Sequence, residues 1–208
     1  MQPPTKIPSR NADPLIVISG ASGFVGRRLA IRAASAHPAT RLFCYVTCDD
    51  SACETQGKRA LKSKNIVPVE TDLITGKGLI DVARQPSVIF HLAANSATWS
   101  KEHSCSDRGT QNFVSSFRLL GPGSHVVYTS SIAVMDTRED CSIPVTETTP
   151  TCHRPFTDYS VRKLMAEKWL QREAPLRGFA FSIVRPVTVY GPEYRPNSVL
   201  GVPRPKAM

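Results

Sequence analysis

The chain has 208 residues, of which 41% are apolar, and it carries a formal net charge of +9. This length suits one domain with a packed core. The positive charges are dispersed rather than gathered in a run, so the composition does not indicate a nucleic-acid partner. No apolar stretch approaches the roughly 18 residues of a membrane span. The six cysteines form no Cys-x-x-Cys pair. We therefore expect a cytoplasmic protein with free thiols, without a metal site or a membrane partner.

The predicted elements alternate between strands and helices. Residues 1–13 are polar and proline-rich and predict a loose tail. Apolar runs predict strands at 14–20, 41–47, 65–70, 87–93, 124–131 and 179–186. The intervening segments predict helices at 24–36, 51–63, 76–84, 106–120 and 158–173. This alternation predicts an α/β fold with a doubly wound parallel sheet, a Rossmann fold in the strand order 3-2-1-4-5-6.

The first strand runs directly into "GASGFVG", a G-x-x-G-x-x-G variant of the dinucleotide-binding fingerprint. Gly20 would allow the tight turn, Gly23 would let a pyrophosphate approach the backbone, and Gly26 would let the helix pack closely. The helix N-terminus would then offer N–H donors to the phosphates. A glycine-rich turn without a ligand is the alternative. The expected cofactor contacts from this loop are Gly20, Ser22, Gly23, Phe24, Val25 and Gly26.

The sequence leaves the choice between NAD and NADP open. An acidic residue at the end of the second strand would favour NAD, but Asp49 and Asp50 lie slightly beyond the predicted end. Arg27 and Arg28 could meet a 2′-phosphate or could be solvated helix charges. Asp72, just after the third strand, could contact the adenine or could cap a helix.

Tyr159 and Lys163 lie four residues apart in "DYSVRK", within the predicted helix 158–173. At this spacing the ammonium can reach the phenol, stabilise the phenolate and lower its pKa toward a value useful in acid–base catalysis. A core aromatic and a solvated cation are the alternatives. We expect the pair to lie off the apolar stripe of this helix, which is predicted to consist of Val161, Leu164, Met165 and Trp169.

The glycine loop, "TDL", "FHLAA", "YTSS", "YSVRK" and "RPVTVYGP" occur in an order that resembles the extended short-chain dehydrogenase/reductase family. This family includes sugar-nucleotide epimerases and dehydratases as well as steroid and flavonoid reductases. The resemblance covers about residues 14–194 and implies a nicotinamide cofactor, a small-molecule substrate and a Ser–Tyr–Lys catalytic group. We expect 14–194 to form the NAD(P)-binding domain. Residues 195–208 would begin a C-terminal lobe or form a loose tail.

The resemblance also implies roles for particular residues. Tyr159 matches the catalytic acid–base, Lys163 the residue that tunes it and binds ribose, and Ser131 the residue that orients the substrate. "HLAA" would border the cofactor and "RPVTVYGP" would line its nicotinamide end. The cofactor contacts implied beyond the glycine loop are Asp72, Leu73, Leu92, Ala93, Ala94, Tyr159, Lys163, Pro186 and Val189.

Several features limit what the resemblance implies. Asp107 stands where the family often has Asn, which leaves the position of the helix 106–120 open. Family members continue well beyond "YGP", so a dinucleotide-binding module or truncated member without efficient turnover is the alternative to an active enzyme. Ile132 and Ala133 replace the Asp-Glu pair of the 4,6-dehydratases, which favours an epimerase or a reductase over a 4,6-dehydratase. A homodimer through the helices 106–120 and 158–173 is also implied.

Overall fold

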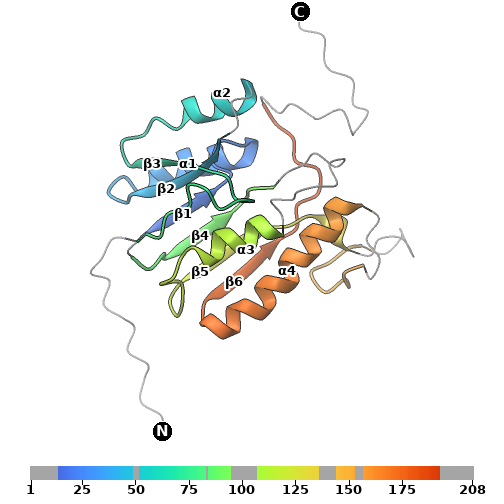
Figure 1. Cartoon of the computed structure of the whole chain (residues 1–208). Helices are drawn as coiled ribbons and strands as arrows, with labels where there is room; N and C mark the ends of the chain where they lie inside the picture. The colour runs from blue at the N-terminus through green and yellow to red at the C-terminus, as the bar shows by residue number, and fades with distance from the viewer. Residues whose placement is uncertain are drawn as a thin grey trace, which may run out of the picture.

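The computed structural model describes residues 14–48, 52–82, 84–94, 107–135, 144–152 and 157–192. These residues form one six-stranded parallel sheet in the order β3-β2-β1-β4-β5-β6 (Figure 1). The strands are β1 (Ile16–Ser19), β2 (Leu42–Thr47), β3 (Ile66–Thr71), β4 (Val88–His91), β5 (His125–Thr129) and β6 (Ala180–Val184). The doubly wound fold and the strand order predicted from the sequence are therefore confirmed. The expected tails at 1–13 and 195–208 lie outside the described residues.

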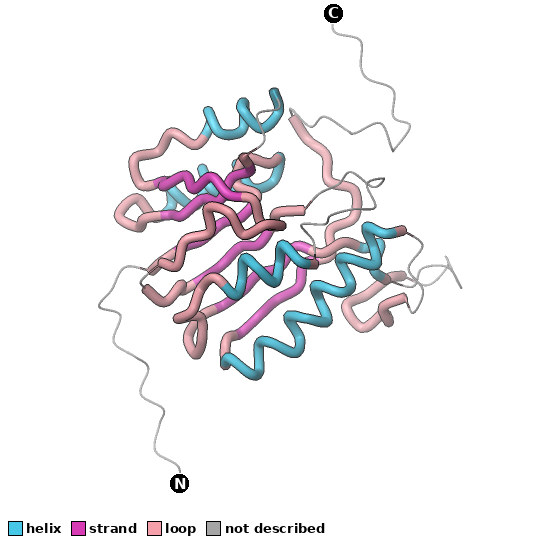
Figure 2. Tube along the Cα trace, viewed as in Figure 1, coloured by secondary structure: helices cyan, strands magenta, loops and turns pink. Residues whose placement is uncertain are grey.

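Helices cover both faces of this sheet (Figures 1 and 2). The helices are α1 (Phe24–Ala36), α2 (Ala52–Ala60), α3 (Arg108–Ser115) and α4 (Asp158–Arg177), with a short 3₁₀ turn η1 (Ile132–Val134). On one face, Val17 packs in a core with Phe113 of α3 and Leu170 of α4. On the other face, Ile18 packs with Ala30 of α1. Neighbouring residues of β1 thus enter opposite cores, as expected for a central strand buried on both faces.

Four predicted helices differ from the structure, one of them the helix predicted at 51–63, which spans only Ala52–Ala60 as α2. The helix predicted at 76–84 is wrong, because the described residues of this segment form turns and loop. Gly76 and Gly78 both have φ of 79°, a left-handed backbone conformation that ends any regular helix there. α3 ends at Ser115, earlier than predicted. α4 runs four residues further than predicted, to Arg177, and then ends on Gly178, which adopts a left-handed φ of 77°.

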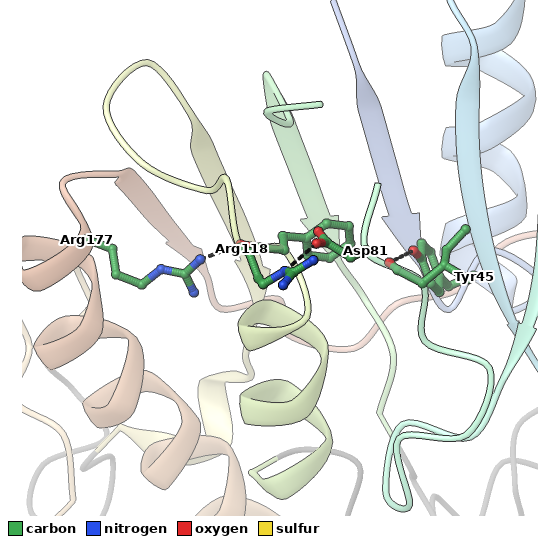
Figure 3. Close-up of polar contacts among 6 residues, drawn as sticks. Tyr45, Asp81, Arg118 and Arg177 are labelled. Atoms are coloured by element: carbon green, nitrogen blue, oxygen red, sulfur yellow. Dashed lines mark hydrogen bonds and ion pairs between the residues drawn. The ribbon is translucent and has the colours of Figure 1, made fainter. Parts of the chain in front are cut away.

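Polar contacts connect strand, loop and helix residues near the amino ends of the strands (Figure 3). The hydroxyl of Tyr45 donates to the carbonyl of Ile80 at 3.1 Å. Arg118 Nε lies 2.6 Å from Asp81 Oδ2 in an exposed ion pair, which stabilises the fold only slightly. Arg177 donates to the carbonyl of Val114, which connects the end of α4 to α3. These contacts hold the edge of the sheet that lies away from the glycine loop.

The sequence predicted free thiols and no membrane-spanning segment. Of the described cysteines, Cys44 and Cys48 are free thiols. Within the described part of the chain, no helix is both long and apolar enough to cross a bilayer.

Candidate active site

The glycine loop connects the carboxyl end of β1 to α1 and has little room for side chains. Gly20 adopts φ of 65°, and a Cβ there would lie 2.8 Å from the backbone nitrogen of Ala93. A Cβ on Gly26 would lie only 2.0 Å from the carbonyl oxygen of Gly20. Two chain segments therefore approach the loop at backbone contact distance. Such an approach requires glycine at both positions.

The start of α1 is suited to hold a phosphate. Gly23 is the N-cap residue, and it supplies no side chain that could cap the first N–H groups of the helix. These donors and the positive end of the helix dipole point out of the first turn. The first turn of α1 contains no acidic residue that would repel an anion. The loop residues therefore fit the pyrophosphate of a dinucleotide.

Gly57 is part of the same structure, although the sequence did not single it out. It lies in α2, and a Cβ at this position would fall 1.9 Å from the carbonyl oxygen of Ser22. The helix thus packs directly on the back of the glycine loop. A glycine in the middle of a predicted helix, where it costs about 1 kcal/mol relative to alanine, was the available signal.

The segment after β4 is fixed beside the loop by Ser19. Its Oγ accepts hydrogen bonds from the backbone nitrogens of Leu92 and Ala93, both at 3.2 Å. The single hydroxyl hydrogen of Ser19 is therefore donated to Nδ1 of His91, 2.5 Å away. Because Nδ1 accepts, Nε2 carries the ring hydrogen and donates it to Thr110 Oγ1 at 2.8 Å. This network assigns one neutral tautomer to His91 and places α3 relative to the loop.

His91 is expected to stay neutral and uncharged throughout the physiological range. Burial, assisted by the charge of Lys163, lowers the pKa of His91 from 6.5 to about 3. As pH falls, His91 is protonated in the unfolded chain before it is protonated in the folded chain. The free energy of unfolding is therefore unaffected by His91 above about pH 6.5 and decreases progressively as pH falls toward 3. Long-range ¹H–¹⁵N NMR should show ring nitrogens of His91 that do not titrate between pH 5 and 9. A midpoint near 6.5 would contradict the buried network.

The start of α4 places Tyr159 in the first turn of the helix. Thr157 and Ser160 form a capping box, in which Thr157 Oγ1 accepts from the Ser160 nitrogen at 3.1 Å and Ser160 Oγ accepts from the Thr157 nitrogen at 3.2 Å. This pairing fixes where the helix begins. One turn later, Lys163 follows Tyr159 on the same side of α4.

Ser131 lies directly before η1, two residues beyond the end of β5. Its Oγ accepts from the Ala133 nitrogen at 3.2 Å, which orients the hydroxyl. Val134 packs against Leu164 of α4 in a small buried cluster, so the turn is held against the helix. The Ser131 hydroxyl lies near the phenol of Tyr159, close enough to influence its pKa. The structure thus places two of the three expected catalytic groups side by side.

Lys163 lies below this pair and is almost fully buried, with 1% of its surface exposed. Its Nζ donates to the carbonyl of Thr129 at 2.7 Å. The same ammonium lies 5.0 Å from the ring centroid of Tyr128 and 5.9 Å from that of Tyr159. The carbonyl at the end of β5 and two aromatic faces therefore compensate for part of the water lost by the charge.

The acid–base state of Tyr159 differs from the sequence expectation. Burial raises the pKa of its phenol above the usual value, and the nearby Ser131 hydroxyl offsets only part of this rise. The expected lowering by Lys163 is not found, although the ammonium lies 5.9 Å from the ring centroid of Tyr159. In this state Tyr159 is a protonated phenol, suited to donate a proton rather than to accept one.

The expected apolar stripe of α4 is wrong in part. Val161 and Met165 are exposed, at 37% and 50%, whereas Leu164 is buried and Trp169 packs at the edge of the core. The buried face instead contains Ser160, Lys163, Leu164, Ala166, Glu167, Leu170 and Ala174. A helix that buries two charged residues cannot be oriented from its apolar residues alone.

Glu167 is a second residue that the sequence did not single out. It is 1% exposed, and Arg185 holds both of its oxygens, with Nε at 3.0 Å from Oε1 and Nη2 at 2.7 Å from Oε2. Arg185 begins the segment after β6. The carbonyl of Pro186 then accepts from the Ile132 nitrogen at 3.1 Å. The segment that includes Val189 is therefore attached to both α4 and the turn of Ser131.

Asp72 forms a turn at the end of β3 rather than a helix cap. Its Oδ1 accepts from the Ile74 nitrogen at 2.9 Å and its Oδ2 from the Thr75 hydroxyl at 2.8 Å. Asn112 of α3 donates to the carbonyls of Leu73 and Ile74, which anchors the helix on this turn. The sequence left the position of α3 open. In the structure, hydrogen bonds to the turn after β3 and to His91 fix this position.

The two arginines after the glycine loop are not solvated helix charges. Arg27 is only 7% exposed. Arg28 lies over the ring of Phe24 at 4.1 Å and donates to the carbonyls of Phe24 and Pro192. The aspartates at 49–50, which could have indicated the preference for NAD, lie outside the described residues.

The strand ends gather these groups at one edge of the sheet. In a parallel sheet, the residues that follow β1, β4, β5 and β6 all meet at the carboxyl edge. A cavity of about 340 Å³ occurs elsewhere, at the amino edge beside Pro14, Arg41 and Arg84, and does not mark this site. Ser130, beside Ser131, has a buried hydroxyl without a hydrogen-bond partner among the described residues. Such a hydroxyl fits a site that is completed by a ligand or water.

The sequence pattern of the NAD dependent epimerase/dehydratase family matches residues 16–202. The chain belongs to this family. A comparison with curated proteins gave no match.

Solved structures share the fold at low sequence identity. UDP-glucuronic acid 4-epimerase from Bacillus cereus, in complex with UDP-glucuronic acid and NAD, is 21% identical with a TM-score of 0.72, over 88% of this chain and 59% of that chain. dTDP-glucose 4,6-dehydratase from Bacillus anthracis, in complex with NAD, is 18% identical with a TM-score of 0.66, over 86% and 56%. RMD from Pseudomonas aeruginosa, complexed with NADPH, is 23% identical with a TM-score of 0.66, over 88% and 56%. This family member thus spans somewhat more than half the length of these proteins.

Proposed function

We propose that this chain binds NAD or NADP and acts as an oxidoreductase or epimerase. Its substrate would be a hydroxyl or carbonyl group of a sugar nucleotide or a similar small molecule. The observation that carries the proposal is the grouping of Ser131, Tyr159 and Lys163 at the carboxyl edge, beside a glycine loop built for a pyrophosphate. The glycine loop, Asp72, Leu73 and residues 92–94 would hold the dinucleotide. Pro186 and Val189 would border its nicotinamide end.

Each residue of the catalytic group would have a defined task. The nicotinamide, when bound, supplies or accepts a hydride at the substrate carbon. Tyr159 would give a proton to the carbonyl oxygen during reduction and take it back during oxidation. Ser131 would hold that oxygen in place by a hydrogen bond, because its hydroxyl lies near the phenol. Lys163 would stabilise the phenolate when Tyr159 loses its proton and would bond the ribose hydroxyls.

The neighbourhood of Ser131 bears on the reaction type. A 4,6-dehydratase requires a further acid and base beside the serine, and Ile132 and Ala133 offer neither. This favours epimerisation or simple reduction. The fold neighbours that act on UDP-glucuronic acid and dTDP-glucose support a sugar nucleotide as the substrate class. Reduction of a steroid- or dihydroflavonol-type carbonyl is the second substrate class.

A dinucleotide-binding module without efficient turnover is the second candidate function. It is favoured by exposed apolar residues in the segment after β6. Val187 and Tyr190 are 70% and 83% exposed, so this side offers no wall for a substrate among the described residues.

The two candidates are separated by one set of assays. The purified chain is titrated with NADH and NADPH by fluorescence, and is then given UDP-galactose, UDP-glucuronic acid and a panel of carbonyl compounds. Binding together with turnover is the expected result for the enzyme. Binding without turnover on any compound would favour the module.

A further inference from the structure

A buried ion pair lies next to the catalytic group and has no part in the chemistry proposed above. Glu167 is 1% exposed and the side chain of Arg185 is 19% exposed. The guanidinium meets the carboxylate with two parallel hydrogen bonds, at 3.0 Å and 2.7 Å. A buried pair of this kind contributes little net stability compared with apolar residues. Its position suggests what else it does.

Helical spacing aligns Glu167 with the catalytic residues. Tyr159, Lys163 and Glu167 follow each other at intervals of four, so they lie along one side of α4. The charge of Glu167 acts on the surroundings of Lys163. After burial, it is a further cause of the raised pKa of Tyr128. Tyr128 in turn lies against the Lys163 ammonium, 5.0 Å from its ring centroid.

Helical spacing offers Lys163 a carboxylate partner, Glu167, besides the carbonyl of Thr129 that it contacts. A carboxylate at i+4 is a common partner of a lysine on a helix. In the structure, however, the two oxygens of Glu167 are held by Arg185, and Lys163 Nζ donates to the carbonyl of Thr129 instead. Both carboxylate oxygens of Glu167 are thus engaged by Arg185.

We propose that Glu167 and Arg185 are positioning residues, in which Arg185 neutralises Glu167 and keeps the Lys163 ammonium directed at Thr129 and Tyr159. The inference rests on the proposed function, in which Tyr159 is the acid–base group. It assigns to the pair the task of setting how readily the Tyr159 phenol ionises. Since Arg185 also begins the segment that borders the nicotinamide end, the pair links the acid–base group to that segment.

The sign of the effect is fixed by the charges. Loss of the Arg185 charge would leave an uncompensated buried anion, which attracts Lys163 and opposes the phenolate. Loss of the Glu167 charge would leave an additional cation, which favours the phenolate. Among the described residues, the other ionisable groups coupled to this cluster are neutral His91 from β4, neutral Tyr128 from β5 and, through Tyr128, Asp107 before α3. The two single variants should therefore shift the ionisation in opposite directions.

The test follows Tyr159 ionisation directly, without turnover. The chain is labelled with 3-fluorotyrosine, which lowers every phenol pKa, and its ¹⁹F resonances are titrated with pH. A Tyr159→Phe sample assigns the resonance. Glu167→Gln should lower the Tyr159 midpoint by about half a pKa unit to one unit, and Arg185→Gln should raise it by a similar amount. The isosteric double variant Glu167→Gln/Arg185→Gln should restore the wild-type midpoint.

Controls separate this role from a merely structural one. Arg118→Gln breaks the exposed pair with Asp81 at the far edge and should leave the Tyr159 midpoint unchanged. If Arg185→Gln does not fold, Glu167→Gln and the double variant still decide the outcome, because they differ only in the Arg185 charge. Shifts of the same sign in both single variants, or no shift in Glu167→Gln, would overturn the proposal.

The same titration is independent of the proposed function. A chain that shows the opposed shifts but no turnover would contradict only the proposed enzymatic function, because the charge arrangement is then as proposed. A chain that turns over substrate without the opposed shifts contradicts only the role of the pair.

Discussion

Replacing Tyr159 with phenylalanine is expected to lower turnover by about 10²- to 10⁴-fold, the range for loss of a general acid–base group. The change removes one hydroxyl, so the affinity for NADH should stay within about twofold, because the ring that packs beside Lys163 is retained. Steady-state rates on the best substrate of the panel, together with NADH titrations, measure both quantities. The separation of the two effects is the distinctive part of this result.

Tyr45→Phe is the matched control for loss of a phenol. Tyr45 is also buried, but its hydroxyl bonds to Ile80 near the amino ends of the strands. Its loss should reduce stability by about 1 kcal/mol and leave turnover unchanged. Equal turnover in wild type and Tyr159→Phe would exclude Tyr159 as the acid–base group. A parallel loss of NADH binding would instead indicate a structural role.

Replacing Gly26 with alanine should abolish detectable dinucleotide binding and reduce stability by about 2–3 kcal/mol, as in overpacked cores. The added Cβ would lie 2.0 Å from the carbonyl oxygen of Gly20, and backbone atoms cannot yield as a flexible side chain can. Either α1 or the loop must move, and the phosphate-binding N–H groups move with it. Urea unfolding and NADH titration of the same preparation measure both effects.

The control for this variant removes a Cβ from the same helix. Ala36→Gly, in the last turn of α1 and exposed, should cost about 1 kcal/mol or less through helix propensity and leave dinucleotide binding intact. Wild-type NADH affinity in Gly26→Ala would contradict the assignment of the glycine loop as the pyrophosphate site.

Much of the fold was predictable because parallel strands buried on both faces have a strong signal. The runs around Val17, Ile89 and Val126 are almost wholly apolar and bounded by polar or glycine residues, which fixes their place as strands. The helix predicted at 76–84 failed for a local reason. Gly76 and Gly78 need a left-handed backbone, and a helical pattern of charges and apolar residues cannot show this.

The site was only partly predictable. The glycine loop is one short stretch of sequence, and Tyr159 and Lys163 lie within another. Each could therefore be identified from the sequence alone. The burial of Lys163 and Glu167 could not, because their partners Thr129 and Arg185 come from the ends of other strands. Burial, which the helical spacing alone cannot show, explains why the pKa of Tyr159 is raised although the sequence predicted it to be lowered.

The central claim is that the glycine loop and the catalytic group form one nicotinamide dinucleotide site. The most direct test titrates the full chain with NADH and with NADPH. Binding is followed by quenching of the protein fluorescence and by isothermal titration calorimetry. The account predicts saturable binding of at least one of them with one site per chain, reduced strongly in Gly26→Ala and retained in Tyr159→Phe. Absence of saturable binding of both dinucleotides by the folded chain would contradict it.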